Sequence, residues 1–272
     1  MKNFSMLTDF YQLTMCDAYL TNDRQNETAV FDLFFRDNPF NNGYSVFAGL
    51  KQIIEYIEDL EFTTKDIKYL RQFDFSDEFL NYLREFEFTG NLYAMQEGQL
   101  IFPFEPIIKV EAPLIEAQLI ETTLLNIVNH QCLITTKAAR IMEAAEDDMV
   151  LEFGLRRGHG PSAGLYGSRA SIIGGCDGTS NVMAGKDFSV NVSGTHAHSW
   201  VMSYENELDA FIDYAERFPN ACILLVDTYD TLEQGVLNAI TVFDNMKEKG
   251  IDPDIYGIRL DSGDLAYLSK EA

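Results

Sequence analysis

Apolar residues recur along this chain with helical spacing in some stretches and with strand-like spacing in others. The clearest helical pattern has four apolar residues at positions i, i+3, i+4 and i+7: Leu50, Ile53, Ile54 and Ile57. The segment 91–112 instead carries short runs rich in apolar, β-branched and aromatic residues, separated by a turn at Glu97-Gly98. This pattern is typical of an antiparallel sheet. Helices and strands therefore mix in the first part of the chain, and we expect residues 1–112 to form an N-terminal α+β domain.

Capping residues and β-branched runs predict further elements in this domain. A helix is expected over residues 5–20, with Thr8-Asp9 as its cap, and a strand over residues 28–36. Two short helices are expected to begin near Thr63 or Thr64 and at Ser76.

A long helical pattern begins at Pro113 and continues towards Asp147. Proline suits the first turn of a helix, because its missing N–H would have no partner there. The pattern is longer than an ordinary helix, and two threonines and Cys132 weaken it, so a break near residues 130–136 is predicted. We expect residues 113–147 to form connecting helices.

After residue 148 short apolar runs alternate with helical segments. Strands are expected at 149–153, 188–192, 221–226 and 254–259, with a further short strand beginning at Ile172-Ile173, and helices at 205–218 and 231–249. This alternation predicts a parallel sheet with functional loops at the carboxyl ends of its strands. At most five such strands are present, whereas a closed α/β barrel needs about eight. We therefore interpret residues 148–272 as the front part of a barrel that carries active-site loops.

Charge and cysteine content narrow the function classes. The formal net charge of −23 argues against a surface that binds nucleic acid or an anionic membrane. It does not exclude a small anionic substrate, because local arginines can reverse the field inside a cleft. No apolar run approaches the ~18 residues that a membrane-spanning helix needs, and the N-terminus lacks the apolar core of a signal peptide. With four scattered cysteines and no CxxC pair, we expect a cytoplasmic protein with reduced thiols.

The loop at residues 193–199 carries the main candidate for chemistry. Its sequence, Ser-Gly-Thr-His-Ala-His-Ser, places His196 and His198 on a turn between an apolar run and a helix. An imidazole titrates near neutral pH and can act as a nucleophile or as an acid–base group. Zinc binding is the alternative, but no HExxH or CxxC spacing supplies further ligands.

Other polar residues follow the expected strands. Three arginines that match phosphate or carboxylate oxygens come after the strand at 149–153: Arg156, Arg157 and Arg169. Neutralisation of surface acids is an alternative of equal weight for Arg157. The loop 174–181 offers backbone amides for an anion, which is a weak signal alone.

Carboxylates follow the last two strands: Asp227, Asp230, Asp261 and Asp264. Such acids can hold Mg²⁺, ribose hydroxyls or an imidazole tautomer. Helix capping is the alternative, and it suits Asp230 and Asp264 better than Asp227 and Asp261.

Five segments together form a specific pattern: residues 7–15, 152–157, 178–182, 194–199 and 259–264. They resemble nicotinate phosphoribosyltransferases, in order and over essentially the whole chain. The resemblance implies the synthesis of nicotinate mononucleotide and pyrophosphate from nicotinate and phosphoribosyl pyrophosphate (PRPP), coupled to ATP hydrolysis, in NAD salvage. It also implies an N-terminal α+β domain packed on an irregular α/β barrel of the type II phosphoribosyltransferase kind, usually in a homodimer.

The resemblance also assigns roles to residues. His198 corresponds to a histidine that ATP phosphorylates, with Asp227 or Asp230 orienting its ring. Phe153 and Tyr11 correspond to the aromatics that enclose the pyridine ring, Tyr11 reaching into the site of the partner subunit. Arg156 and Arg259 would contact PRPP phosphates or the substrate carboxylate, and Asp261 the ribose or its metal. The remaining assignments are substrate contacts at Thr195, Ser262 and Gly263, and Mg²⁺ at Asp227 and Asp261.

Two alternatives stay open. Nicotinamide-using relatives have an aspartate after Gly-Thr that binds the amide, and this chain has Ser180 there, which favours nicotinate. Family members are also longer, and the site for the PRPP 5′-phosphate is expected beyond Ala272. The 272-residue chain would then be inactive by itself, or a truncated, non-catalytic homologue that acts as a binding or dimer partner.

Overall fold

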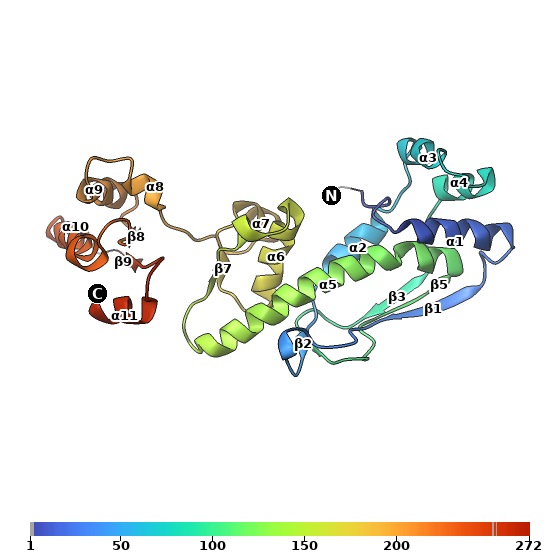
Figure 1. Ribbon diagram of the computed structural model, residues 1–272, viewed down its shortest axis with the longest axis horizontal. Coiled ribbons are helices and arrows are strands. Elements are labelled where there is room, and N and C mark those ends of the chain that lie inside the picture. Colours follow the sequence, from blue (N-terminus) through green and yellow to red (C-terminus); the bar gives the residue numbers. More distant parts are fainter. Residues whose placement is uncertain (1–2, 252, 254) are drawn as a thin grey trace. The chain divides into compact units, whose positions relative to one another are not determined.

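The computed structural model describes residues 3–251, 253 and 255–272. The chain forms two compact units, Met1–Val192 and Ser193–Ala272. Among the described residues, no helix is both long enough and apolar enough to cross a membrane. Figure 1 labels the helices and strands of both units.

The first unit contains an antiparallel sheet with the strand order β1-β5-β3. Its strands are β1 (Thr28–Leu33), β5 (Ile108–Pro113) and β3 (Asn91–Ala94). The central strand β5 alternates buried with more exposed residues, so one of its faces packs into the core. Nearby, β2 (Ser45–Val46) and β4 (Leu100–Ile101) form a second antiparallel pair. The predicted antiparallel sheet is thus confirmed.

Four helices accompany these strands: α1 (Phe10–Thr21), α2 (Leu50–Glu58), α3 (Thr64–Leu70) and α4 (Asp77–Arg84), with a short 3₁₀ turn at Pro39–Asn41. Thr63 caps α3 in a reciprocal pair with Asp66, and the Ser76 hydroxyl accepts a hydrogen bond from Phe79 N at 3.1 Å at the start of α4. Both predicted helix starts are confirmed. The first helix begins later than expected, at Phe10, and Asp9 makes no side-chain capping bond.

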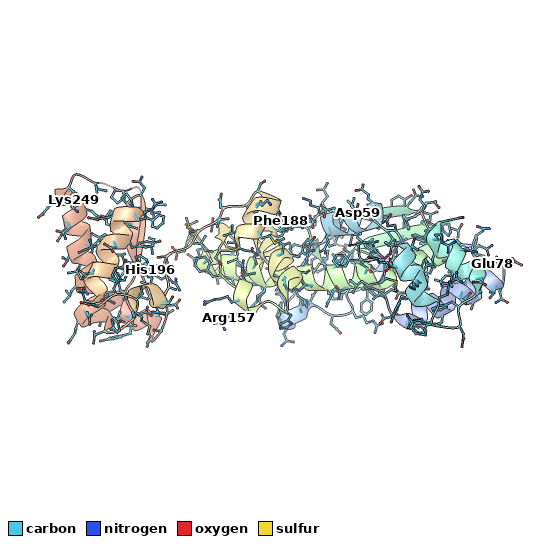
Figure 2. The ribbon with its side chains drawn as sticks, turned by 90° about the horizontal axis from the view of Figure 1, so that it is seen from above. Asp59, Glu78, Arg157, Phe188, His196 and Lys249 are labelled. Atoms are coloured by element: carbon cyan, nitrogen blue, oxygen red, sulfur yellow. The ribbon has the colours of Figure 1, made fainter. Side chains whose placement is uncertain are left out.

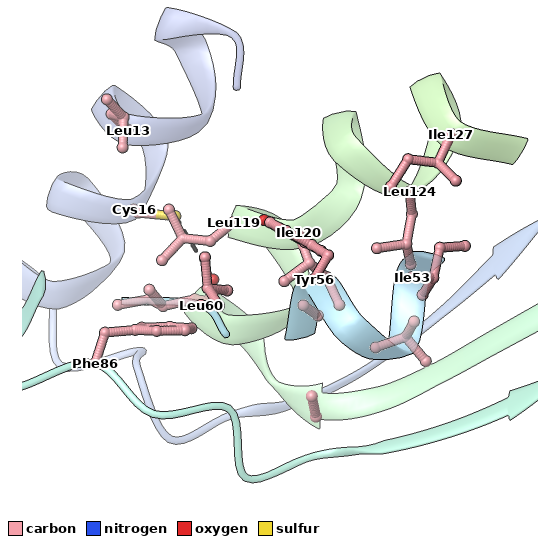
Figure 3. Close-up of a cluster of buried hydrophobic side chains, with 14 of the residues drawn as sticks. Leu13, Cys16, Ile53, Tyr56, Leu60, Phe86, Leu119, Ile120, Leu124 and Ile127 are labelled. Atoms are coloured by element: carbon pink, nitrogen blue, oxygen red, sulfur yellow. Dashed lines mark hydrogen bonds between the residues drawn. The ribbon is translucent and has the colours of Figure 1, made fainter. Parts of the chain in front are cut away.

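A single helix, α5 (Leu114–Ala145, 32 residues), crosses this unit beside the sheet (Figure 1). Its first half shares a buried cluster with α1 and α2, shown in Figure 3, in which Ile53, Tyr56 and Ile120 pack together. The predicted break near residues 130–136 is wrong. Thr135 Oγ1 donates to Ala170 O at 3.0 Å, and Thr136 Oγ1 accepts from Val46 N at 2.9 Å. Both threonines are buried against other elements, and this packing outweighs their low helix propensity.

Two short parallel strands follow α5, namely β6 (Leu151–Glu152) and β7 (Gly178–Thr179). Between and after them lie a 3₁₀ turn (Leu155–Arg157), α6 (Pro161–Ile173) and α7 (Val182–Phe188). The strand predicted at Ile172-Ile173 is wrong, because these residues complete α6. The strand predicted at 188–192 reduces to one bridge between Val192 and Thr179, since Phe188 ends α7 and Ser189 has a left-handed backbone.

The second unit has the predicted parallel pair, β8 (Ala221–Leu225) and β9 (Ile255–Arg259). Its helices are α8 (His198–Val201), α9 (Glu207–Arg217), a π-helical turn (Thr231–Gly235), α10 (Val236–Glu248) and α11 (Leu265–Glu271). Val201, Phe211 and Leu224 lie in a separate buried core. Asp254, where the last strand was expected to begin, lies outside the described residues.

Candidate active site

His198 lies where three loops of the second unit meet. It begins α8, and its Nδ1 atom lies 3.1 Å from Oγ1 of Thr228, in the loop after β8. Its Nε2 atom lies 3.6 Å from Asp261 Oδ2 and 4.0 Å from Asp227 Oδ1. Asp227 follows β8 and Asp261 follows β9. The carboxyl ends of two parallel strands therefore bring both carboxylates beside one imidazole.

The loop after β9 fixes the orientation of Asp227. Its side chain is only 2% exposed, and Oδ2 accepts hydrogen bonds from Asp261 N at 2.8 Å and from Ser262 Oγ at 2.7 Å. Its Oδ1 atom is buried and has no hydrogen-bond partner among the described residues. Leaving a buried carboxylate oxygen unpaired is costly, so Oδ1 is suited to accept a proton or contact a cation.

Asp261 is an ionised neighbour of His198. The Arg259 guanidinium donates a hydrogen bond to Asp261 Oδ1 and lowers the pKa of this carboxyl below its ordinary value, and His198 contributes to the same shift. The cluster therefore combines one imidazole, one guanidinium and two carboxylates, a set that can stabilise charge during phosphoryl transfer.

The two histidines of this loop have different surroundings. His196 is 7% exposed, accepts a hydrogen bond from Leu225 N at Nε2 (3.2 Å), and packs against Tyr214 and Phe211. Burial lowers the pKa of His196, so its ring is held neutral. Figure 2 labels His196 within this unit. The side chain of His198, by contrast, is 38% exposed. His196 is a structural residue, and His198 is the histidine available for chemistry.

The remaining candidates of this unit divide between the cluster and the scaffold. Gly263 has a φ of +79°, which favours glycine in the turn that carries Ser262. Thr195 Oγ1 donates to Ile223 O on β8. Asp230 accepts from Glu233 N at 2.8 Å and Asp264 from Tyr267 N at 3.1 Å, so both cap helices, as the capping alternative predicted.

The first unit holds the other candidates. Phe153 is 39% exposed just after β6, and Arg156 is exposed in the 3₁₀ turn that follows. Ser180 is half-buried after β7, and its N–H donates to Glu152 O at 3.0 Å, so the two strand ends lie together. Tyr11, on α1, is 50% exposed and lines a cavity of about 540 Å³ with Arg36 and Asn126.

Two interpretations from the sequence need correction in this unit. The backbone amides of the loop 174–181 are not available to bind an anion, because the N–H groups of residues 174–177 and 179–181 all donate within the protein. Arg169 is not free for an anion, because it pairs with Glu97 at 2.6 Å in a largely buried ion pair. Arg157 is exposed and points away from the ribbon in Figure 2.

Two residues in direct contact with the candidates were not predicted. Thr228 contacts His198, and the backbone carbonyl of Glu152 accepts a hydrogen bond from Ser180 N at 3.0 Å. Thr228 lies beside Asp227 in the sequence and Glu152 beside Phe153, so adjacency to a candidate at a strand end was the only available signal.

The carboxylates near His198 fit a magnesium ion that also binds substrate phosphates. Mg²⁺ in such sites takes one or two protein carboxylates and completes its shell with water and phosphate oxygens. Asp227, with its unpaired Oδ1, and Asp261 supply two. No cluster of three or more His, Cys, Asp or Glu side chains in the described part of the chain could hold a metal by itself.

Family models match both parts of the chain. Residues 6–129 match the nicotinate phosphoribosyltransferase (NAPRTase) N-terminal domain, and residues 149–271 match the nicotinate phosphoribosyltransferase (NAPRTase) family. The nicotinate phosphoribosyltransferase of Bacillus subtilis is 54% identical over 271 residues, covering 99% of this chain and 54% of that protein. The enzyme of the same name from Dictyostelium discoideum is 40% identical, covering 97% of this chain and 52% of that protein. The chain thus spans about half the length of the curated relatives it matches.

Solved structures agree on the fold. The structure of human nicotinic acid phosphoribosyltransferase is similar with a TM-score of 0.90 at 33% identity, covering 97% of this chain and 63% of that one. A nicotinate-nucleotide pyrophosphorylase from Pyrococcus furiosus has a TM-score of 0.78 at 24% identity, covering 99% of this chain and 61% of that one, and supports the fold alone. These similarities confirm the predicted fold class, an α+β domain followed by barrel elements of the type II phosphoribosyltransferase kind.

Proposed function

The chain belongs to the nicotinate phosphoribosyltransferase family. On that premise we propose that it carries two sites of an enzyme that forms nicotinate mononucleotide and pyrophosphate from nicotinate and PRPP: the histidine site around His198, and the base site around Phe153 and Ser180, where the pyridine ring of nicotinate binds. The observation that carries this proposal is the position of His198 beside Thr228, Asp227 and Asp261 at the ends of two parallel strands. The product places the reaction in NAD salvage, and the proposed location is the cytoplasm.

In the proposed coupling to ATP, His198 accepts the γ-phosphoryl group. A ring nitrogen attacks phosphorus, the bond to the bridging oxygen breaks, and ADP leaves. The carboxylates of Asp227 and Asp261 face Nε2 and can hold the ring proton, while Thr228 contacts Nδ1. Fixed carboxylates beside an imidazole stabilise the positive charge that develops on the ring.

The glycosyl transfer step breaks the bond between C1 of the ribose and pyrophosphate. Positive charge develops on the ribose and negative charge on the leaving group. We assign Arg259 and Arg156 to the phosphates or the substrate carboxylate, and Asp261 to the ribose or its metal. Ser262, Gly263 and Thr195 complete the proposed substrate contacts. Bound at Asp227 and Asp261, Mg²⁺ would neutralise charge on the departing pyrophosphate.

Nicotinate is proposed to stack between Phe153 and Tyr11, because a flat heteroaromatic ring gains from an aromatic on each face. Tyr11 is assigned to the site of a partner subunit in a homodimer. Ser180 brings no negative charge, so it tolerates the carboxylate of nicotinate, whereas an aspartate there would repel it and suit nicotinamide. This contrast favours nicotinate over the nicotinamide alternative.

The second candidate function is a non-catalytic homologue that binds ligand or pairs with another chain. The contacts around His198 and Asp227 favour catalysis instead, because a lost function would not keep a buried, unpaired carboxylate oxygen beside an imidazole.

Formation of nicotinate mononucleotide by the 272-residue chain, with PRPP and Mg²⁺ and with or without ATP, tests the proposal. Product that increases with ATP is the expected result. If no product forms while ATP still labels the protein, the histidine site is present and the chain needs a complement. The absence of both product and label would exclude the proposed activity for this chain.

A further inference from the structure

The Glu152 side chain joins the two segments that carry Phe153 and Ser180. Its Oε1 atom accepts a hydrogen bond from Gly154 N, directly after Phe153. Its Oε2 atom accepts from Thr179 Oγ1 at 2.6 Å, directly before Ser180, and its backbone carbonyl accepts from Ser180 N at 3.0 Å. One residue therefore holds the main chain on both sides of the proposed pyridine site.

The same network is anchored in the buried part of the first unit. Thr179 is fully buried, and its Oγ1 also accepts from Asn181 N at 3.0 Å. Asn181 Nδ2 donates to Ser168 Oγ on α6 at 3.1 Å, and Asn181 Oδ1 accepts from the first-turn N–H groups of α7. The Glu152 carboxylate is thereby tied to two helices through side chains that have little freedom to move.

The strands themselves are too short to fix these loops. β6 and β7 share only two residue pairs, Leu151 with Gly178 and Glu152 with Thr179. All residues from Phe153 to Gly158 are exposed, so burial does not immobilise the turn that follows β6. Backbone hydrogen bonds within the turn, from Arg157 N to Gly154 O at 2.8 Å and from Gly158 N to Leu155 O at 3.3 Å, shape it locally. The Glu152 carboxylate adds the side-chain link between this turn and β7, and hydrogen bonds to a carboxylate are about twice as strong as those between neutral groups.

We propose that Glu152 is a positioning residue for pyridine recognition, whose carboxylate sets the spacing between the ring of Phe153 and the hydroxyl of Ser180. It acts through the main chain at Gly154 and Thr179 and does not itself contact substrate. The inference rests on the proposed function, because nicotinate is the ligand that we assign to Phe153 and Ser180.

Two variants and a matched control test this inference in the 272-residue chain. Glu152→Ala removes both acceptor oxygens, and Glu152→Gln keeps one. Glu58→Gln makes the same chemical change at an exposed residue of α2 with no side-chain hydrogen bond among the described residues. The measurements are amide hydrogen exchange, KM and kcat for nicotinate, and ATP-derived labelling of the protein.

In Glu152→Ala, exchange at residues 153–158 and 178–185 is expected to rise about tenfold, the factor that one lost charge-assisted hydrogen bond gives. KM for nicotinate is expected to rise by a similar factor, kcat to change by less than about twofold, and labelling to stay unchanged. Glu152→Gln should lie between Glu152→Ala and the parent chain, and Glu58→Gln should match the parent chain.

Three results would overturn the inference. Unchanged exchange in both segments would show that the carboxylate does not hold them. Faster exchange throughout the first unit would make Glu152 a general stabilising residue. Altered exchange with an unchanged KM would show that the Glu152 hydrogen bonds are not needed for nicotinate recognition. If the parent chain forms no product, KM cannot be measured, and nicotinate binding, measured by NMR, then decides on Glu152 together with the exchange data. The proposed function fails for this chain only if the ATP-derived label is absent as well.

Discussion

The two groups of candidate residues are built in opposite ways. Around His198 the functional side chains contact one another, and charged groups set the geometry: Asp227, Arg259 and Asp261. Around Phe153 and Ser180 the functional side chains are exposed or half-buried, and a polar network beneath them holds the main chain. We therefore expect the histidine cluster to be most sensitive to changes of charge, and the base site to changes of spacing and shape.

The largest expected effect is at His198 itself. His198→Ala removes the only imidazole that contacts the two carboxylates in the described structure, so acid-labile labelling from ATP should be abolished. His159→Ala, in an exposed loop of the first unit, is the control and should keep the label. Acid-labile phosphate that persists in His198→Ala would contradict the assignment.

A charge placed at the base site should change specificity without changing the histidine cluster. Ser180→Asp puts a carboxylate where the carboxylate of nicotinate is proposed to lie, and like charges repel by several kcal/mol when close. The ratio of kcat/KM for nicotinate to that for nicotinamide should fall at least about tenfold. Ser162→Asp, at an exposed position of α6, is the control. An unchanged ratio would remove Ser180 from recognition.

A smaller effect is expected when one neutral contact of His198 is lost. Thr228→Val keeps the shape of the side chain and removes the hydroxyl that lies 3.1 Å from Nδ1. A net hydrogen bond of about 1 kcal/mol corresponds to roughly a fivefold change, so the rate of labelling should fall by about that factor. Thr228→Ser restores the hydroxyl and should restore the rate; if it labels as slowly as Thr228→Val, the hydrogen bond is not the cause.

The smallest effect concerns pH. Arg259 lowers the pKa of Asp261, so this carboxyl favours the folded state at pH values above its ordinary pKa, and the contribution is lost as the pH falls through the lowered value. Arg259→Gln should move the pKa of Asp261 up towards the ordinary value of 3.8. NMR titration of the Asp261 carboxyl carbon measures this shift, and an identical titration curve in the variant would show that Arg259 is not the cause.

Apolar spacing and capping residues predicted the helices whose formation depends on residues close together in the sequence. The spacing of Leu50 and Ile53 predicted α2, and Thr63 and Ser76 marked two helix starts because their hydroxyls cap neighbouring amides. The break near Thr135 was mispredicted, because its hydroxyl is satisfied by Ala170, 35 residues away.

The same limit applies to the site. The sequence pattern predicted that Asp227 and Asp261 follow two parallel strands, whose carboxyl ends carry the functional loops. It could not tell which histidine of the loop is buried, because the aromatic rings that cover His196 come from Phe211 and Tyr214 on α9. Thr228 and Glu152 were missed for the same reason, since their importance comes from contacts that appear only in the folded chain.

The continuous helix α5 links two distant parts of the first unit. Thr122 on this helix contacts Asp9, beside Tyr11, and Thr135 contacts Ala170 of α6, the helix that follows the Phe153 turn. Thirteen residues separate these two contacts, a rise of about 20 Å. Because the helix runs without a break between these two contacts, it fixes the separation of α1 from α6 within the first unit, and a proline in its middle would release that constraint.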